Sequence, residues 1–232
     1  MALCLAGGMQ PTRLAIYDMD KTVTRKATFT AFLVHAARTL APWRLLLTPV
    51  VGLASLAYAA RLIDRGRLKA FNYGLLVGRR TPVQMRPVVE SFAAAQLAGN
   101  VLPGARARIA EDKAAGRTMV LATASYRLYA EPIGRALGFD HVIGTEQKLD
   151  ARGRVLGEIE GDNCYGASKR AMILAWLETR GLAREGLHIR FYSDHVSDAV
   201  VHRWSDEPFA TNPSRGLRGV AATEGWPVLE WR

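Results

Sequence analysis

The sequence has few cysteines and no apolar run long enough to cross a membrane. Cys4 and Cys164 are the two cysteines among its 232 residues, which argues against a disulfide framework and fits a reducing compartment. Residues 45–60 form an uncharged stretch of 16 residues, whereas a transmembrane helix needs roughly 20. The start has no basic region ahead of its short apolar run, so we expect no signal peptide, and either Met1 or Met9 serves as a native start. These absences favour a cytoplasmic protein.

Acidic residues are scarce in one part of the chain. The net charge is +10, and residues 26–101 hold ten lysines and arginines against Asp64 and Glu90, a net charge of +8. Basic segments usually meet an anionic partner, which can be nucleic acid, an acidic membrane surface or a phosphorylated substrate. Arginines on a solvated surface explain the charge equally well, so the charge alone does not choose among these readings.

Three short apolar segments end in polar residues. They are RLAIYD (13–18), TMVLATAS (118–125) and HIRFYSD (188–194), and the second and third are followed by helical patterns over 126–137 and 196–204. Strands that alternate with helices predict a parallel sheet, in which ligands bind beyond the carboxyl ends of the strands. Asp18, Thr123 and Asp194 occupy these three ends.

The remaining segments complete an α/β fold, namely a Rossmann-like three-layer α/β/α core with an inserted all-helical cap. We assign residues 1–25 and 102–232 to the core and 26–101 to the cap, whose helices break at proline and glycine residues. A hairpin is expected around residues 151–153, and the helix 168–181 is expected to start at Ser168 and stop at Gly181. The tail reads strand, helix, strand.

Two carboxylates, Asp18 and Asp20, stand two positions apart at the first strand end. Alone they are most often a solvated turn, but four motifs together resemble the haloacid dehalogenase superfamily of phosphohydrolases. The motifs are DMDKT, Thr123 in VLATAS, Lys169 in GDNCYGASK, and YSDHVSD with Asp194 and Asp198. The closest branch is the one with a helical cap after the first motif (subfamily IB), which contains phosphoserine phosphatase.

This resemblance implies a role for each residue. Asp18 is the nucleophile that forms an aspartyl-phosphate, and Asp20 is the general acid and base, which calls for a raised pKa. Mg²⁺ is held by Asp18, Asp194 and the backbone carbonyl of Asp20, with Asp198 behind them or reaching the metal through water. Thr123 binds the phosphoryl oxygens and Lys169 neutralises them. Further substrate contacts are expected from Thr22, Ser125, Arg65 and Arg67.

The motifs also differ from the family pattern. Ser193 replaces a usual glycine, and His195, which we expect to face solvent, follows Asp194. Phosphoserine phosphatases carry a substrate-binding glutamate nine residues after the nucleophile, where this chain has Ala27. DKTVT further resembles the phosphorylated segment of P-type ATPases, which would make Asp20 the nucleophile but requires a large membrane domain. We therefore keep Asp18 as the nucleophile. For Cys164, near the third motif, we expect no role beyond packing.

The cap bears on the substrate. Its uncharged stretch 45–60, bounded by Arg44 and Arg61, is either a buried helix pair, which is the default, or an element lying in a membrane interface. FTAFL, the interrupted apolar stretch and GLLVGR loosely resemble helical-capped (C-type) phosphatidylglycerophosphatases. We favour a lipid-linked phosphate as substrate, with peripheral contact to an anionic membrane at its inner face and no nucleic acid. A small soluble phosphomonoester, phosphoserine-like or other, is the runner-up, and a non-catalytic anion-binding module is the alternative of another class.

Overall fold

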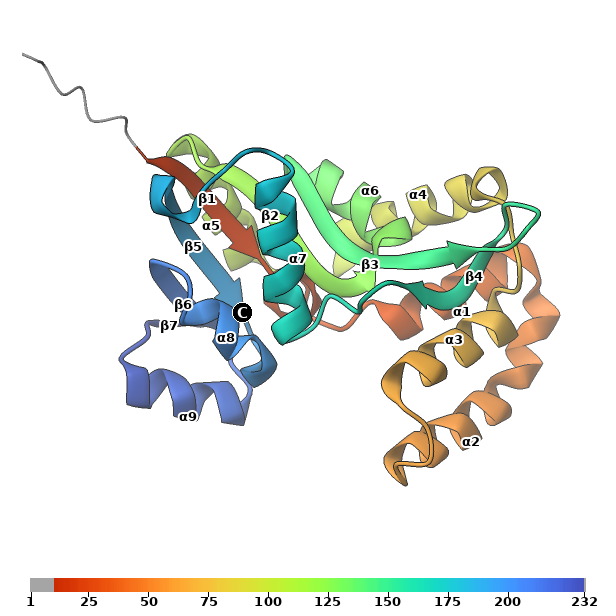
Figure 1. The fold of residues 1–232 in the computed structure, drawn as a ribbon. Coiled ribbons are helices and arrows are strands. Elements are labelled where there is room, and N and C mark those ends of the chain that lie inside the picture. The colour runs from red at the N-terminus through yellow and green to blue at the C-terminus, as the bar shows by residue number, and fades with distance from the viewer. Residues whose placement is uncertain (1–10, 232) are drawn as a thin grey trace, which may run out of the picture.

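Seven strands form one sheet in the order β4-β3-β2-β1-β5-β6-β7 (Figure 1). In the computed structural model the described residues are 11–231, so the expectations about Cys4 and the native start lie outside them. The strands are β1 (Thr12–Tyr17), β2 (Thr118–Tyr126), β3 (His141–Leu149), β4 (Val155–Glu160), β5 (Leu187–Ser193), β6 (Glu207–Thr211) and β7 (Val228–Leu229). Neighbouring strands are parallel except β3 and β4, which form the expected antiparallel hairpin.

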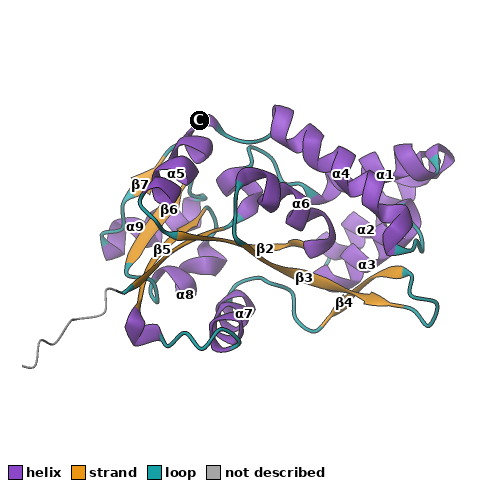
Figure 2. Ribbon diagram, turned by 90° about the horizontal axis from the view of Figure 1, so that it is seen from above, coloured by secondary structure: helices purple, strands orange, loops and turns teal. Residues whose placement is uncertain are grey.

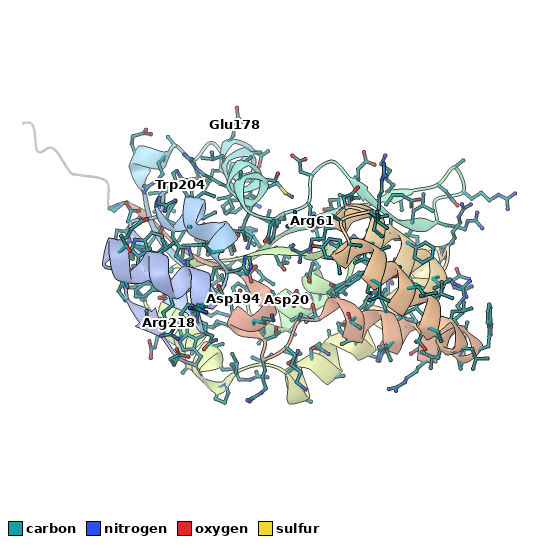
Figure 3. All side chains as sticks on the ribbon, turned by 90° about the horizontal axis from the view of Figure 1, so that it is seen from below. Asp20, Arg61, Glu178, Asp194, Trp204 and Arg218 are labelled. Carbon is teal, nitrogen blue, oxygen red and sulfur yellow. The ribbon has the colours of Figure 1, made fainter. Side chains whose placement is uncertain are left out.

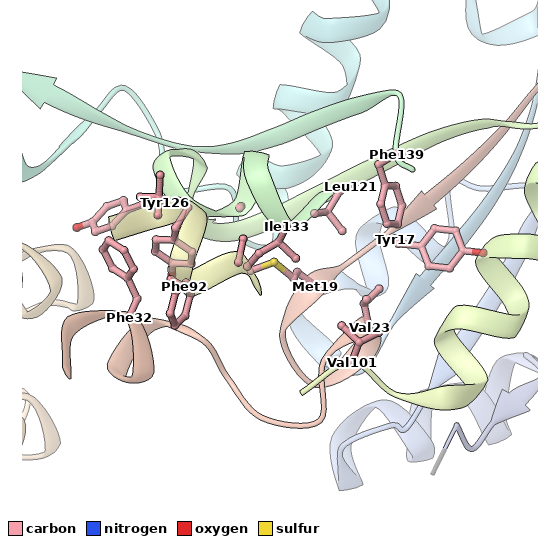
Figure 4. Close-up of a cluster of buried hydrophobic side chains, with 14 of the residues drawn as sticks. Tyr17, Met19, Val23, Phe32, Phe92, Val101, Leu121, Tyr126, Ile133 and Phe139 are labelled. Carbon is pink, nitrogen blue, oxygen red and sulfur yellow. The ribbon is translucent and has the colours of Figure 1, made fainter. Parts of the chain in front are cut away.

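Helices cover both faces of the sheet because the central strands are apolar on both sides (Figure 2). In β1, Leu14 and Ile16 pack into the cluster that holds the helix α7 (Ala167–Glu178). The alternate residues Ala15 and Tyr17 pack into the larger cluster on the opposite face, part of which Figure 4 shows. Helices α5 (Pro103–Ala114) and α6 (Arg127–Leu137) lie on that second face, whereas α8 (Ala199–His202) lies with α7. The predicted three-layer core is therefore confirmed.

The inserted segment is helical, as predicted. It comprises α1 (Phe29–Leu40), a 3-10 helix (Pro42–Leu47), α2 (Thr48–Ala59), α3 (Arg65–Leu76) and α4 (Pro82–Gly99). The outer cap helix α2 lies away from the sheet in Figure 1, whereas α1, α3 and α4 contribute buried side chains to the larger core cluster. Phe32 of α1 and Phe92 of α4 pack on the ring of Tyr129 in α6 at centroid distances of 4.4 and 5.6 Å.

The connections into and out of this segment run side by side. Thr24 and Val101 form an antiparallel bridge, and the amide of Arg25 donates to the carbonyl of Asn100 at 2.7 Å. The amide of Leu102 donates to the carbonyl of Val23 at 3.0 Å. The chain therefore leaves and rejoins the core at one place.

Three local expectations need correction. Ser168 lies inside α7, because Gly166 adopts a φ of +58° and ψ of −127° at the N-cap position, and α7 ends at Glu178, before Gly181. The predicted helix 196–204 is shorter and forms a 3-10 turn (Val196–Asp198) followed by α8. The stretch 45–60 is not a buried helix pair, since no residue of α2 is buried. Beyond α8 the tail follows the expected order, with α9 (Arg215–Glu224) between β6 and β7.

A glycine sets the position of α3 over the core. A Cβ atom added at Gly157 of β4 would lie 2.8 Å from the Cα of Ala70 and 2.9 Å from the Cβ of Tyr73, and it would also clash with the Ala70 carbonyl oxygen. The carbonyl of Gly157 accepts a hydrogen bond of 2.6 Å from the hydroxyl of Tyr126. The backbones of α3 and β4 can therefore approach only where a side chain is absent.

We expect Gly157→Ala to push α3 off β4 and to destabilise the fold by about 1–3 kcal/mol, the usual cost of overpacking. Gly74→Ala is the matched control, because Gly74 lies in α3 with nothing within 4 Å of an added Cβ, and it should leave stability unchanged or raise it. Urea unfolding midpoints measure both changes. Equal midpoints for the two variants would show that the close approach does not constrain α3.

Candidate active site

The polar residues at the ends of β1, β2 and β5 meet in one cavity of about 210 Å³. Figure 3 shows Asp20 and Asp194 from this region in the middle of the molecule. The cavity is lined by Asp18, Asp20, Lys21, Arg65, Thr123, Ala124, Tyr165, Lys169, Asp194, His195, Ser197 and Asp198. Seven of the ten predicted site residues thus come together, among them Arg65 of the cap.

A tight loop after β1 presents the first two carboxylates. The amide of Asp18 continues the β1–β5 ladder by donating to the carbonyl of Tyr192 at 2.9 Å. Asp20 keeps an extended backbone (φ −72°, ψ 123°), and Lys21 then turns into the left-handed region at φ 62°. Asn212 donates to the Lys21 carbonyl at 3.2 Å and supports this unusual conformation. The strand end therefore turns sharply and keeps Asp18 and Asp20 at the cavity.

Lys169 joins two of the carboxylates. Its ammonium group donates to Asp18 Oδ1 at 2.7 Å and to Asp198 Oδ2 at 2.6 Å, and its side chain is almost completely buried. The hydroxyl of Ser193 donates to the same Asp198 oxygen at 2.7 Å. Ser193, which replaces the usual glycine, therefore orients Asp198 from the end of β5.

Burial and charge distribute the protons in this cluster. Burial raises the pKa of Asp18 to about 7, against the opposing charge of Lys169. Burial also raises the pKa of Asp194 to about 6, while Lys21 and Lys169 oppose it. For Asp198, burial is outweighed by the charge and hydrogen bond of Lys169, so its pKa lies below the ordinary value. Burial would lower the pKa of Lys169, but Asp18 and Asp198 together hold it above its usual range.

These residues fit a magnesium ion through oxygen atoms. Among residues 11–231, no group of three or more His, Cys, Asp and Glu side chains is arranged to hold a metal. Mg²⁺ does not require one, since it binds proteins through one or two carboxylates and keeps waters and phosphate oxygens. Asp18 and Asp194 are two buried carboxylates in one cavity, and burial disfavours the charge of each. A cation between them would offset that cost, and the Asp20 carbonyl would supply a third oxygen.

Asp20 is held by the start of the cap. Its Oδ1 accepts hydrogen bonds from the amide and the hydroxyl of Thr28, each at 2.8 Å. Its Oδ2 accepts a hydrogen bond of 2.9 Å from Ser125, whose hydroxyl in turn accepts one from Tyr129. Asp20 thus connects Thr28, the N-cap residue of α1, to the end of β2.

The other predicted substrate contacts separate into two groups. Thr123 lines the cavity and accepts a hydrogen bond from the Ser125 amide at 3.1 Å, and Arg65 lines it from the cap. Ser125 is buried behind the cavity against Asp20, and Thr22 is buried outside the lining. Arg67 is exposed and pairs with Asp64 at 3.3 Å, also outside the cavity. Arg65 and Thr123 therefore line the cavity, whereas Thr22, Ser125 and Arg67 lie outside its lining.

Four cavity residues were not singled out from the sequence, namely Lys21, Ala124, Tyr165 and Ser197. All of them lie within the recognised motif segments, so a search of the motifs' neighbours would have found them. The guanidinium carbon of Arg65 lies 4.8 Å from the centre of the Tyr165 ring, and the hydroxyl of Tyr165 lies 3.3 Å from Nδ1 of His195.

Two residues whose roles the sequence leaves open have contrasting surroundings. His195 is exposed, as expected, yet it also lines the cavity. Cys164 is completely buried, and burial raises the pKa of its thiol to about 12. Its thiol therefore stays protonated, in keeping with packing.

The comparisons with known proteins agree with this geometry. The family model for haloacid dehalogenase-like hydrolases matches residues 15–200, and the chain belongs to this family, as its motifs predict. The predicted enzyme class, phosphoric monoester hydrolase, is confirmed with it.

Individual relatives extend over most of the chain. A probable phosphatase of Mycobacterium tuberculosis is 29% identical over 229 residues, 97% of this chain and 78% of its own. A solved structure of a protein of unknown function from Bordetella pertussis Tohama I is 28% identical, with a TM-score of 0.86, and covers 96% of this chain and 100% of its own. A phosphoserine phosphatase structure at 13% identity shares the fold, with a TM-score of 0.60 over 96% of this chain and 95% of its own.

We expect Lys169→Met to destabilise the metal-free protein by about 3 kcal/mol or more, because it leaves Asp18 and Asp198 buried beside each other without a cation. Adding Asp198→Asn removes one of these charges and should recover part of the loss. Urea unfolding in EDTA measures the two variants. A double variant no more stable than Lys169→Met would mean that the ion pairs do not determine the packing of α7 against β1.

Proposed function

We propose that this chain is a magnesium-dependent phosphomonoesterase that works through an aspartyl-phosphate at Asp18 and prefers a lipid-linked phosphate. The observation that carries the chemistry is the buried contact of 2.7 Å between Lys169 and Asp18 at the cavity end of β1. It pairs a candidate nucleophile with a fixed positive charge where a phosphoryl group would have to approach.

The residues divide the reaction into two displacements. In the first, a carboxylate oxygen of Asp18 bonds to phosphorus, the bond to the leaving oxygen breaks, and Asp20 gives that oxygen a proton. In the second, water bonds to phosphorus while Asp20 takes its proton, and inorganic phosphate and the Asp18 carboxylate are released. Thr123 and Lys169 donate to the phosphoryl oxygens throughout. The solved phosphoserine phosphatase with a phospho-aspartyl intermediate analogue supports this scheme by its fold.

Asp18, Asp194 and the backbone carbonyl of Asp20 would hold Mg²⁺. When bound, the ion offsets the charge of the phosphoryl oxygens that an anionic nucleophile must meet. Asp198 keeps Lys169 in place from the opposite side, at 2.6 Å. Its contribution is positional, because its carboxylate is already engaged by Lys169 and Ser193.

The cap supports a lipid-linked substrate such as phosphatidylglycerophosphate. Arg65 is the first residue of α3 and lines the cavity, and it follows the exposed apolar helix α2 by six residues. Ala27, at the position of the expected amino-acid-binding glutamate, is exposed and cannot pair with an ammonium group. A small soluble ester is the second candidate, favoured by the fold shared with phosphoserine phosphatase.

Phosphate release against phosphatidylglycerophosphate in mixed micelles and against a panel of soluble phosphomonoesters tests the proposal. We expect turnover with Mg²⁺, none with EDTA, and a loss of about 10³-fold or more in Asp18→Asn, since the nucleophile is removed. Turnover of soluble esters alone would keep the chemistry and remove the lipid substrate. An active Asp18→Asn enzyme, or one unaffected by EDTA, would refute the mechanism.

Arg65 and Arg67 provide a matched pair for the substrate contact. We expect Arg65→Met to raise KM for a short-chain, dispersed phosphatidylglycerophosphate by about tenfold, the equivalent of one charge-assisted hydrogen bond. Arg67→Met should leave KM unchanged, because Arg67 is exposed outside the cavity. Steady-state kinetics compare the two, and equal effects would show that Arg65 acts through general surface charge and not through the cavity.

A further inference from the structure

The outermost cap segment carries a continuous apolar surface, which we call the α2 face: Trp43, Leu46, Val50, Leu53, Leu56 and Leu62. Apart from Val50, these side chains are between 61% and 81% exposed. The first five are spaced by three or four residues along Pro42–Ala59, so they follow one side of the helical segment, and Leu62 comes shortly after its end. Few monomeric proteins leave such a surface uncovered without a use for it.

The polar side chains of α2 do not interrupt this surface. The hydroxyl of Thr48 donates to the carbonyl of Leu45 at 2.8 Å, and that of Ser55 donates to the carbonyl of Val51 at 2.9 Å. Both hydroxyls are thus satisfied by their own helix. A neighbouring stripe of Val51, Ala54 and Ala57 is half-buried, so α2 uses a different side to pack on the cap. The α2 face therefore does not take part in packing the cap.

The charges beside the α2 face are positive. Arg61 follows α2 directly and is exposed, and Figure 3 shows it at the end of the cap helices that lies toward the core. Arg65 follows at the cavity. The acid of this segment, Asp64, is engaged, because it accepts from the Arg67 amide at 2.8 Å and pairs with the Arg67 side chain. A second copy paired through the same face would bring the arginines of both copies to one interface, whereas anionic lipid phosphates would complement them.

We propose that the α2 face lies in the interface of an anionic phospholipid bilayer, with Arg61 at the phosphates and the cavity beside the membrane surface. No helix within residues 11–231 is long and apolar enough to span a bilayer. The twelve residues of α2 would extend about 18 Å, well short of the roughly 30 Å hydrocarbon core, so the helix lies in the interface plane. This orientation brings a lipid-linked phosphate to Arg65, and in that respect it rests on the proposed function.

Co-sedimentation with phosphatidylglycerol vesicles and with phosphatidylcholine vesicles tests the proposal. We expect binding to the anionic vesicles and a loss of affinity of about tenfold or more in Leu53→Ser/Leu56→Ser. Arg61→Gln should lose about fivefold. The control variants Val83→Ser/Leu149→Ser and Arg152→Gln remove exposed apolar and basic side chains elsewhere and should bind like the wild type.

Hydrolysis of p-nitrophenyl phosphate by each variant monitors the fold and the active site separately. Unchanged hydrolysis together with lost vesicle binding supports the proposal, and vesicle binding by an enzyme that hydrolyses nothing would refute the proposed function but not the surface. The proposal is overturned by three outcomes: no vesicle binding, equal binding to both kinds of vesicle, or a dimer in light scattering that Leu53→Ser/Leu56→Ser dissociates.

Discussion

The structure of the site depends on one buried ammonium group. Two ionised carboxylates are costly to bury side by side without a cation, and Lys169 supplies one to Asp18 and Asp198 at 2.7 and 2.6 Å. These three residues come from the end of β1, the first turn of α7 and the turn after β5. Each element must therefore be in place before the charges can be paired. The strand order, with β1 between β2 and β5, accounts for this requirement, and it brings Thr123 to the same edge.

Much of the core could be predicted from the sequence because its signals are local. Apolar runs that end in Asp18, Thr123 and Asp194 identify buried parallel strands and their carboxyl ends, and the structure confirms both. Helix boundaries were less predictable. Ser168 is a good N-cap residue by type, but the backbone conformation of Gly166 starts α7 two residues earlier. Residue preferences predict such a backbone angle only weakly. The turn after β5 likewise left α8 with four residues.

The site was predictable where a motif fixes a residue, and less so where the cap contributes. Lys169 and Asp198 follow from their motifs. Ser125 instead donates to Asp20, which is distant in the sequence, and Arg67 pairs with Asp64 at the surface. Residues 45–60 illustrate the same limit. An uncharged stretch has the composition of a buried helix. The packing shows that α3 covers one side of α2, whereas nothing within the described chain covers the other side.

The paired connections at Thr24 and Val101 have a consequence for how such enzymes diversify. Because the inserted segment leaves and rejoins the core at one point, it can be exchanged as a module without moving a strand of the sheet. The close approach of α3 to β4 at Gly157 is one condition on this exchange, and a second one lies at the active site. Phe32 and Phe92 cover Tyr129, and Tyr129 donates to Ser125, which donates to Asp20. Any replacement module must bring its own apolar cover to this ring, so the chemistry of the core limits which modules evolution could graft there.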